Sequence, residues 1–275
     1  MEILFNELSL TGQFDDLEDF TKNALLPFIA ILKEMQNFST LLLKKGDVWE
    51  RMITPDNNLH SVMISRTSDE ARRFKLAIAT LTKEPFWDFD TKQDTETVYL
   101  FDGHNIKGSS PAEACERDKV IVSFISSVIS CNPLHILRND TSIALVNLTS
   151  SGILPKLLWD QKEITFESYV KTKFTGERFD FSKVENKMGF SEIQVQEQDL
   201  FIDTFHKITA LTWDQIYSDN GLKYKEYHGQ LNESFRGRKT YKFRASQKIR
   251  CHGYREDNIF VVIGFEVNHK MSDRG

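Results

Sequence analysis

The sequence predicts an α+β fold in two modules: an acidic domain of mixed helices and strands over residues 1–188 and a small basic domain over residues 189–275. Helical and strand-like hydrophobic patterns mix along the first module, whereas in the second a helix pair precedes strands that alternate apolar and basic side chains. Residues 223–255 hold ten Lys and Arg against two Glu, a net charge of about +8, while residues 1–222 carry about −11. Opposite charge on two parts of one chain indicates two modules.

The composition is that of an ordinary globular protein. The chain has 275 residues, 40% hydrophobic and 27% charged, which is enough for one large core or two smaller ones. It has no run of eighteen apolar residues, and its N-terminus lacks the pattern of a secretory signal, so we expect a cytoplasmic protein with no membrane contact. The three widely spaced cysteines predict reduced thiols and exclude a disulfide framework or a CxxC metal knuckle.

The first module opens with helical patterns. Residues 15–45 place acids in the first turn and apolar residues at helical spacing, and Pro27 predicts either two helices or one kinked helix. A second helix is expected over residues 71–81, ending before a proline. A third is expected over residues 111–128, where a proline occupies the first turn.

Two strands are expected within the same module. Residues 95–101 and 142–148 are rich in β-branched and aromatic side chains, and residues 102–105 form a turn after the first strand. From residue 152 to residue 190 the aromatic side chains alternate with charged ones without a clean period. We place the module boundary at the end of this stretch, near residues 187–189.

The second module is predicted to be a helix pair followed by a three-stranded antiparallel meander. The helices are expected at residues 197–210 and 212–217, the second with Thr212 as its N-cap. The strands are expected at residues 240–246, 248–254 and 259–267. The last strand is a nearly continuous apolar run, which is typical of a central strand.

Basic side chains occupy one face of the first two of these strands. Lys242 and Arg244 alternate with apolar residues on one strand, and Lys248 and Arg250 do so on the next. These residues are either a phosphate-binding surface or the solvated face of a half-buried sheet. We favour the phosphate-binding surface, because solvated faces normally mix signs and this face has almost no acids.

This pattern resembles the RelE/ParE-like toxin superfamily. The residues that carry the resemblance are Tyr-Lys-Phe-Arg-Ala-Ser (241–246), Lys-Ile-Arg (248–250) and Asn-His-Lys (268–270). In that family the matching strands carry Tyr-Arg-Leu-Arg, Tyr-Arg-Val and a terminal His-Arg. RelE-like members cleave RNA, often mRNA on the ribosome, whereas ParE-like members bind DNA gyrase. The resemblance covers residues 189–275 and implies that Arg244 and Arg250 face phosphate with His269 beside them.

The chain departs from that family in two respects. A module of nearly 190 residues precedes the toxin-like unit, whereas the toxins are usually small and free-standing. No tyrosine follows residues 268–270, where the family often places an active-site residue, and Tyr254 is the tyrosine that could substitute.

Metal-independent RNA cleavage needs a base for the 2′-hydroxyl, cations for the charge that develops on phosphorus, and an acid for the leaving oxygen. Four residues could fill these catalytic roles, namely Arg244, Lys248, Arg250 and His269. Further nucleic-acid contacts are expected from Arg236, Arg238, Lys239, Lys242, Arg255 and Lys270. His252 shares the polar face, but a lone histidine is more often structural than a proton shuttle.

The sequence therefore predicts a toxin-like or phage-defence effector that binds and cleaves RNA through its basic sheet, and that binds a protein partner through the acidic module. No cofactor and no metal site is expected, and the glycine-rich loops of ATPases do not occur. One alternative is a non-enzymatic interaction subunit of a nucleic-acid-associated complex. A weaker one is a metal-dependent DNA nuclease, since Glu266 with Lys270 resembles the acid and lysine of restriction-type enzymes.

Overall fold

The computed structural model describes residues 1–10, 14–64, 84–125, 129–228 and 238–267. The fold is α+β, as predicted, and it divides into two compact units, Met1–Leu154 and Pro155–Gly275. The helix predicted at residues 71–81 lies outside the described residues. Within the described part of the chain, no helix is both long and apolar enough to cross a bilayer.

The first unit is built on a seven-stranded mixed sheet of order β2-β1-β5-β7-β6-β3-β4. Its strands are β1 (Glu2–Phe5), β2 (Leu41–Leu43), β3 (Tyr99–Phe101), β4 (His104–Asn105), β5 (Val120–Val122), β6 (Leu134–Arg138) and β7 (Thr141–Leu148). The strands β2, β1, β5 and β7 are parallel, while β6, β3 and β4 pair antiparallel. The parallel strands β1 and β5 are short apolar runs, as expected for strands buried on both faces.

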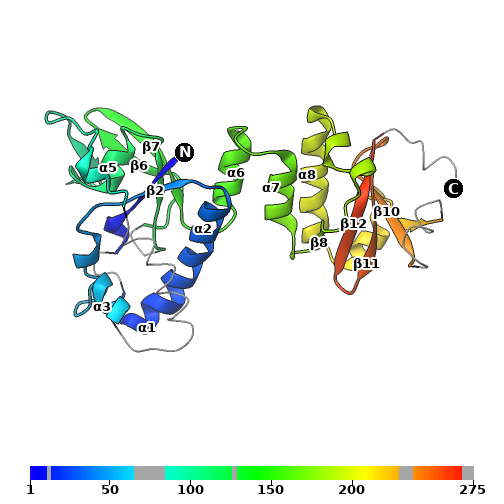
Figure 1. The fold of residues 1–275 in the computed structure, drawn as a ribbon, viewed down its shortest axis with the longest axis horizontal. Coiled ribbons are helices and arrows are strands. Elements are labelled where there is room, and N and C mark those ends of the chain that lie inside the picture. Colours follow the sequence, from blue (N-terminus) through cyan, green and yellow to red (C-terminus); the bar gives the residue numbers. More distant parts are fainter. Residues whose placement is uncertain (11–13, 65–83, 126–128, 229–237, 268–275) are drawn as a thin grey trace. The chain divides into compact units, whose positions relative to one another are not determined.

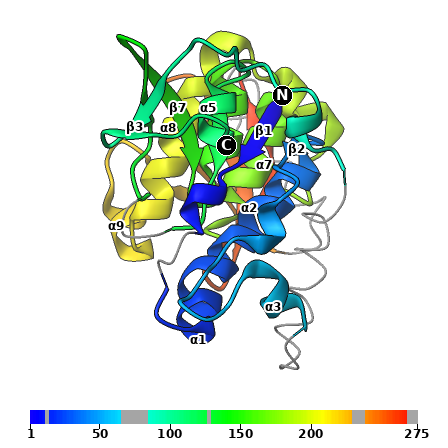
Figure 2. The same cartoon turned by 90° about the vertical axis from the view of Figure 1, so that its left-hand side faces the viewer.

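Helices of the first unit are mostly short. They are η1 (Glu7–Ser9), α1 (Leu17–Asp19), the π-helix η2 (Phe20–Leu25), α2 (Leu26–Asn37), η3 (Val48–Glu50), α3 (Leu59–Ile64), η5 (Trp87–Phe89) and α5 (Ser110–Ala114). Figures 1 and 2 show α1 and α2 as one continuous helical run, with Pro27 in the first turn of α2.

Two predicted helices of this unit are too long. The helical run ends at Asn37 rather than at residue 45, because residues 41–43 form β2 and pair with β1. The helix expected over residues 111–128 ends at Ala114. Lys119 then takes a positive φ of 61°, which turns the chain, and the β-branched run that follows becomes the buried strand β5.

The second unit contains a five-stranded sheet of order β8-β12-β11-β10-β9, in which β8 is parallel to β12 and the other pairs are antiparallel. Its strands are β8 (Phe179–Asp180), β9 (Lys225–Tyr227), β10 (Thr240–Arg244), β11 (Arg250–Glu256) and β12 (Ile259–Glu266). Its helices are α6 (Ile153–Asp160), α7 (Phe166–Phe174), η6 (Asn186–Met188), η7 (Phe190–Glu192), α8 (Val195–Ala210) and α9 (Trp213–Ser218). The predicted helix pair corresponds to α8 and α9, and the predicted meander to β10, β11 and β12.

A phenylalanine-rich core on one face of the sheet places the unit boundary at 154/155 rather than at 188/189. Phe174 of α7 and Phe179 of β8 pack against Phe205 of α8, with ring centroids 5.4 and 4.8 Å apart. The same core includes Phe243 of β10 and Phe265 of β12. Figure 1 shows α7 and α8 on one side of this sheet. Residues 155–188 therefore belong to the second unit.

A β-bulge sets which side chains share a face of this sheet. His252 is opposite Gly264, but Gly253 is opposite Val262, so β12 carries one extra residue at this point. The extra residue shifts the alternation of β12. As a result Phe265 still points into the phenylalanine core while Glu266 reaches the face that carries His252.

We predict that Gly253→Ala lowers the free energy of unfolding by about 1–3 kcal/mol, the usual range for overpacking. A Cβ at this position would lie 2.2 Å from the carbonyl oxygen of Val261 and 2.6 Å from the Phe260 ring. Urea unfolding of the full chain, followed by tryptophan fluorescence, measures the change. Gly221→Ala is the control, because the atoms nearest to its Cβ belong to the Asp219 and Lys207 side chains. Equal midpoints for the two variants would contradict the prediction.

Candidate nucleic-acid interface

On the sheet face opposite the phenylalanine core, charged side chains lie in two rows. Each row runs across neighbouring strands. Lys225, Lys242 and His252 are direct neighbours on β9, β10 and β11. Arg244, Arg250 and Glu266 are direct neighbours on β10, β11 and β12. We call these six residues the cationic face. It holds four cations and one carboxylate, in agreement with the predicted basic strand face.

The cationic face has an inner and an outer part. Lys242 and Arg250 are each 5% exposed, Glu266 is 3% exposed and His252 is fully buried. Lys225 is exposed and Arg244 is half-buried. The interpretation of Lys242 and Arg250 as residues of an open, solvated face is therefore wrong: both share the predicted face but lie beneath its surface. Lys248 is exposed in the turn between β10 and β11.

His252 and Glu266 form the central pair of the inner part. His252 Nε2 and Glu266 Oε2 are 2.8 Å apart, and both side chains are buried. The ring of Tyr227 meets the imidazole edge to face at 4.9 Å, and Lys242 Nζ lies 4.8 Å from the Tyr227 ring centroid. Within the described residues, His252 Nδ1 is buried and has no hydrogen-bond partner. The expectation of a structural histidine agrees with this packing, but its pairing with Glu266 was not predicted from the sequence.

The surroundings of Lys242 and His252 disfavour the protonated form of both side chains. Burial lowers the pKa of Lys242, the neighbouring Lys225 lowers it further, and Glu266 opposes the shift. Burial also lowers the pKa of His252, although its hydrogen bond to Glu266 acts in the opposite direction. A bound anion would relieve this imbalance, because it would stabilise the charged form of Lys242.

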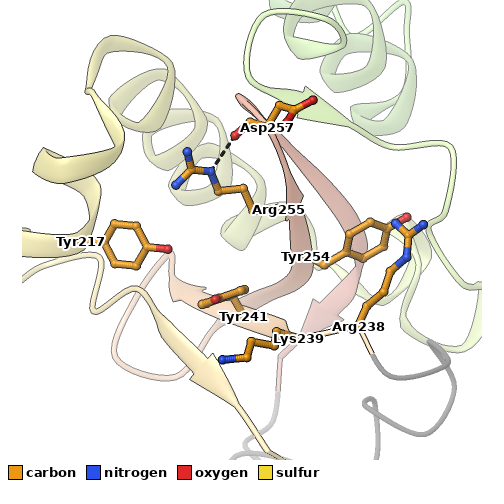
Figure 3. A pocket seen from close by; sticks show the side chains of 7 residues that line it. All are labelled: Tyr217, Arg238, Lys239, Tyr241, Tyr254, Arg255 and Asp257. Atoms are coloured by element: carbon orange, nitrogen blue, oxygen red, sulfur yellow. Dashed lines mark hydrogen bonds between the residues drawn. The ribbon is translucent and has the colours of Figure 1, made fainter.

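Three other residues that were predicted to contact nucleic acid line an open pocket, where β10 begins and β11 ends. The pocket has a volume of about 530 Å³ and is lined by three tyrosines, three cations and one aspartate (Figure 3). Its lining residues are Tyr217, Arg238, Lys239, Tyr241, Tyr254, Arg255 and Asp257. We call it the tyrosine pocket. The cations of this pocket were predicted as nucleic-acid contacts, whereas no binding role was predicted for Tyr217 of α9 or Tyr241 of β10.

Three predicted site residues, Arg236, His269 and Lys270, lie outside the described residues. The proposed pairing of Glu266 with Lys270 lies there in part as well. In the described ranges, no group of three or more His, Cys, Asp or Glu side chains is placed to hold a metal ion. The three cysteines are free thiols, as expected, with Cys115 and Cys251 buried and Cys131 exposed.

The first unit carries a separate buried polar network where β1 and β5 end. Asn6 Nδ2 donates to Ser123 Oγ at 2.9 Å, and Ser9 Oγ donates to the Asn6 carbonyl at 2.6 Å. Glu7 accepts a hydrogen bond from the Ser110 backbone N–H at 2.9 Å, and burial raises the pKa of its carboxyl group. These bonds join distant segments of the unit, which is a structural role.

Comparisons with protein-family models, with curated proteins and with solved structures gave no match to this chain.

We predict that the second unit loses stability as the pH falls from 7.5 to 5.5. The pKa of His252 is lower in the folded chain than its ordinary value of 6.5, so the unfolded chain binds a proton first and the free energy of unfolding falls with pH. Glu266, Lys242 and Arg250 face this imidazole and set the size of the effect.

His252→Gln should flatten the dependence in this window, because the amide can still donate to Glu266 but does not titrate. Thermal unfolding at a series of pH values measures it. His206→Gln, a change of an exposed histidine on α8, should keep the wild-type slope. The same slope in wild type and His252→Gln would overturn the prediction.

Proposed function

We propose that the second unit binds RNA at the cationic face and cleaves it, as a toxin-like or phage-defence effector acting in the cytoplasm. The observation that carries the proposal is the charge of this face: four cations with a single carboxylate, which is bonded to His252. The acidic first unit is the proposed site for a protein partner.

The burial of Lys242 supports an anionic ligand. Desolvating lysine and arginine side chains is costly unless opposite charge is close by. Lys242 instead has Lys225, Arg250 and Arg244 among the charges that act on it, and Glu266 opposes them. A chain of phosphates on the outer cations would supply the missing negative charge, as single-stranded RNA does.

Cleavage would use the two guanidinium groups that face each other across β10 and β11. Arg244 is half-buried and would contact the phosphate, while the buried Arg250 directly opposite it would add positive charge from beneath the surface. The 2′-oxygen would attack phosphorus, and the 5′-oxygen would leave with a proton. We assign Lys248, exposed beside this pair, to the proton transfers.

A non-enzymatic interaction subunit is the second candidate, and one observation favours it. The imidazole and the carboxylate of the cationic face are both buried, so neither is positioned to exchange a proton with a bound substrate. RNA binding without cleavage would then be the whole activity of this face.

We predict that Arg244→Ala weakens binding of single-stranded RNA about tenfold, because a hydrogen bond to a charged group contributes on the order of 1.5 kcal/mol. The slope of log affinity against log salt should fall by about 0.7, the value for one phosphate contact on a single strand. Fluorescence anisotropy with the full chain and an end-labelled RNA measures both. Lys173→Ala, on α7 across the phenylalanine core, is the control and should change neither.

We also predict that the full chain fragments single-stranded RNA in the presence of EDTA, and that Lys248→Ala and Arg244→Ala reduce the rate at least tenfold with the fold intact. Growth and RNA integrity after induced expression in bacteria provide the test in cells. Binding with no cleavage would favour the interaction subunit. Cleavage that stops in EDTA would favour the metal-dependent nuclease.

A further inference from the structure

Arg255, on the wall of the tyrosine pocket, is held in one orientation. Its guanidinium carbon lies 4.3 Å from the ring centroid of Trp213, and its Nε donates to the Asp257 carbonyl at 2.6 Å (Figure 3). Its two terminal nitrogens make no hydrogen bond within the described residues. A stacked guanidinium with both terminal N–H groups available is a preorganised fork for a phosphate group.

The platform beneath Arg255 is itself fixed. Trp213 Nε1 donates to Asn258 Oδ1 at 3.0 Å. Arg178 lies near the same ring, with its guanidinium carbon 5.5 Å from the centroid, and its Nη2 donates to the Leu211 carbonyl at 2.9 Å. Little side-chain entropy would therefore be lost when Arg255 binds an anion.

Tyr217 and Tyr241 line the pocket on the same side of it as each other, near Arg255 (Figure 3). Tyr241 stacks on the buried Tyr224 at 5.1 Å, and Tyr217 meets Tyr224 edge to face at 5.0 Å. The Tyr217 side chain is nevertheless 48% exposed. Rings that are supported from behind and open at the front are suited to contact with the face of a nucleobase.

The remaining cations of the pocket already have carboxylate partners. Arg238 forms an ion pair with Glu256 and lies 4.8 Å from the Tyr254 ring centroid. Lys239 Nζ is 3.7 Å from a carboxylate oxygen of Glu226. Arg255 is therefore the cation of this pocket best placed to bind phosphate.

The pocket lies where β11 ends, and its walls come from both faces of the sheet. Arg250, His252 and Tyr254 occupy alternate positions on one face of that strand, so Tyr254 is about 13 Å from Arg250, whereas Arg255 lies on the opposite face with Cys251 and Gly253. The pocket volume of about 530 Å³ falls within the usual range for small-molecule sites. A base that remains paired and stacked in a duplex could not enter it.

We propose that the tyrosine pocket holds one unpaired nucleotide of an RNA strand, with its phosphate on Arg255 and its base against Tyr217 and Tyr241. This inference rests on the proposed function and adds to it a site for one base and its phosphate.

The test uses the full chain, a single-stranded RNA and the same sequence as a duplex. Tyr217→Ala should weaken binding of the single strand about five- to a hundredfold, the range found for base–aromatic stacking, and leave duplex binding unchanged. Tyr217→Phe keeps the ring and should bind as the wild type does. Arg255→Lys keeps the charge but loses the fork, so it should also weaken binding. Unchanged single-strand binding by Tyr217→Ala and Arg255→Lys would overturn the inference and leave the proposed function standing.

Titration with uridine 5′-monophosphate and with uridine separates the two proposals. The wild type should bind the nucleotide more tightly than the nucleoside, and Arg255→Gln should abolish that difference. If the wild type binds no RNA, the proposed function is wrong, and nucleotide binding that depends on Arg255 would still support the pocket. If it binds neither RNA nor nucleotide, both proposals are wrong.

Discussion

The register shift between β11 and β12 is the constraint on which the second unit depends. Without the extra residue at this point, Glu266 would point into the phenylalanine core and Phe265 into the cationic face. The shift is possible because residues 253 and 264 are glycines. Neighbouring backbone or side-chain atoms approach both positions so closely that a Cβ would collide with them. One local irregularity thus pairs a carboxylate with His252 and keeps the apolar core complete.

A concentration of positive charge on one face requires a strong apolar core on the other. Aromatic rings from α7, α8, β8, β10 and β12 interlock there, so the repulsion between neighbouring cations is offset by burial of large side chains. At one end of the sheet, Tyr241 of the tyrosine pocket packs against this core, and Arg255 lies over the core residue Trp213. The core therefore supports the tyrosine pocket as well as the charged face of the sheet.

Local alternation in the sequence was enough to predict the helix pair, the meander and the shared face of Lys242, Arg244 and Arg250. Burial of Lys242 and Arg250 could not be predicted, because it depends on segments that pack from elsewhere in the chain. The side of the sheet that Glu266 takes depends on a bulge, for which the glycine within an apolar strand was the available signal. The boundary was misplaced because β8 has only two residues and joins β12 through contacts that are distant in sequence.

The short strand β8 has a further consequence for how the protein can be divided. It covers one side of β12, a strand of eight residues with an almost wholly buried sequence. A fragment that began at residue 189 would lack β8, and β12 would become a long, apolar sheet edge with unpaired backbone groups. Such edges recruit strands from other molecules and promote aggregation. The smallest independent piece of this half of the chain therefore begins near residue 155, with α7 and β8 included.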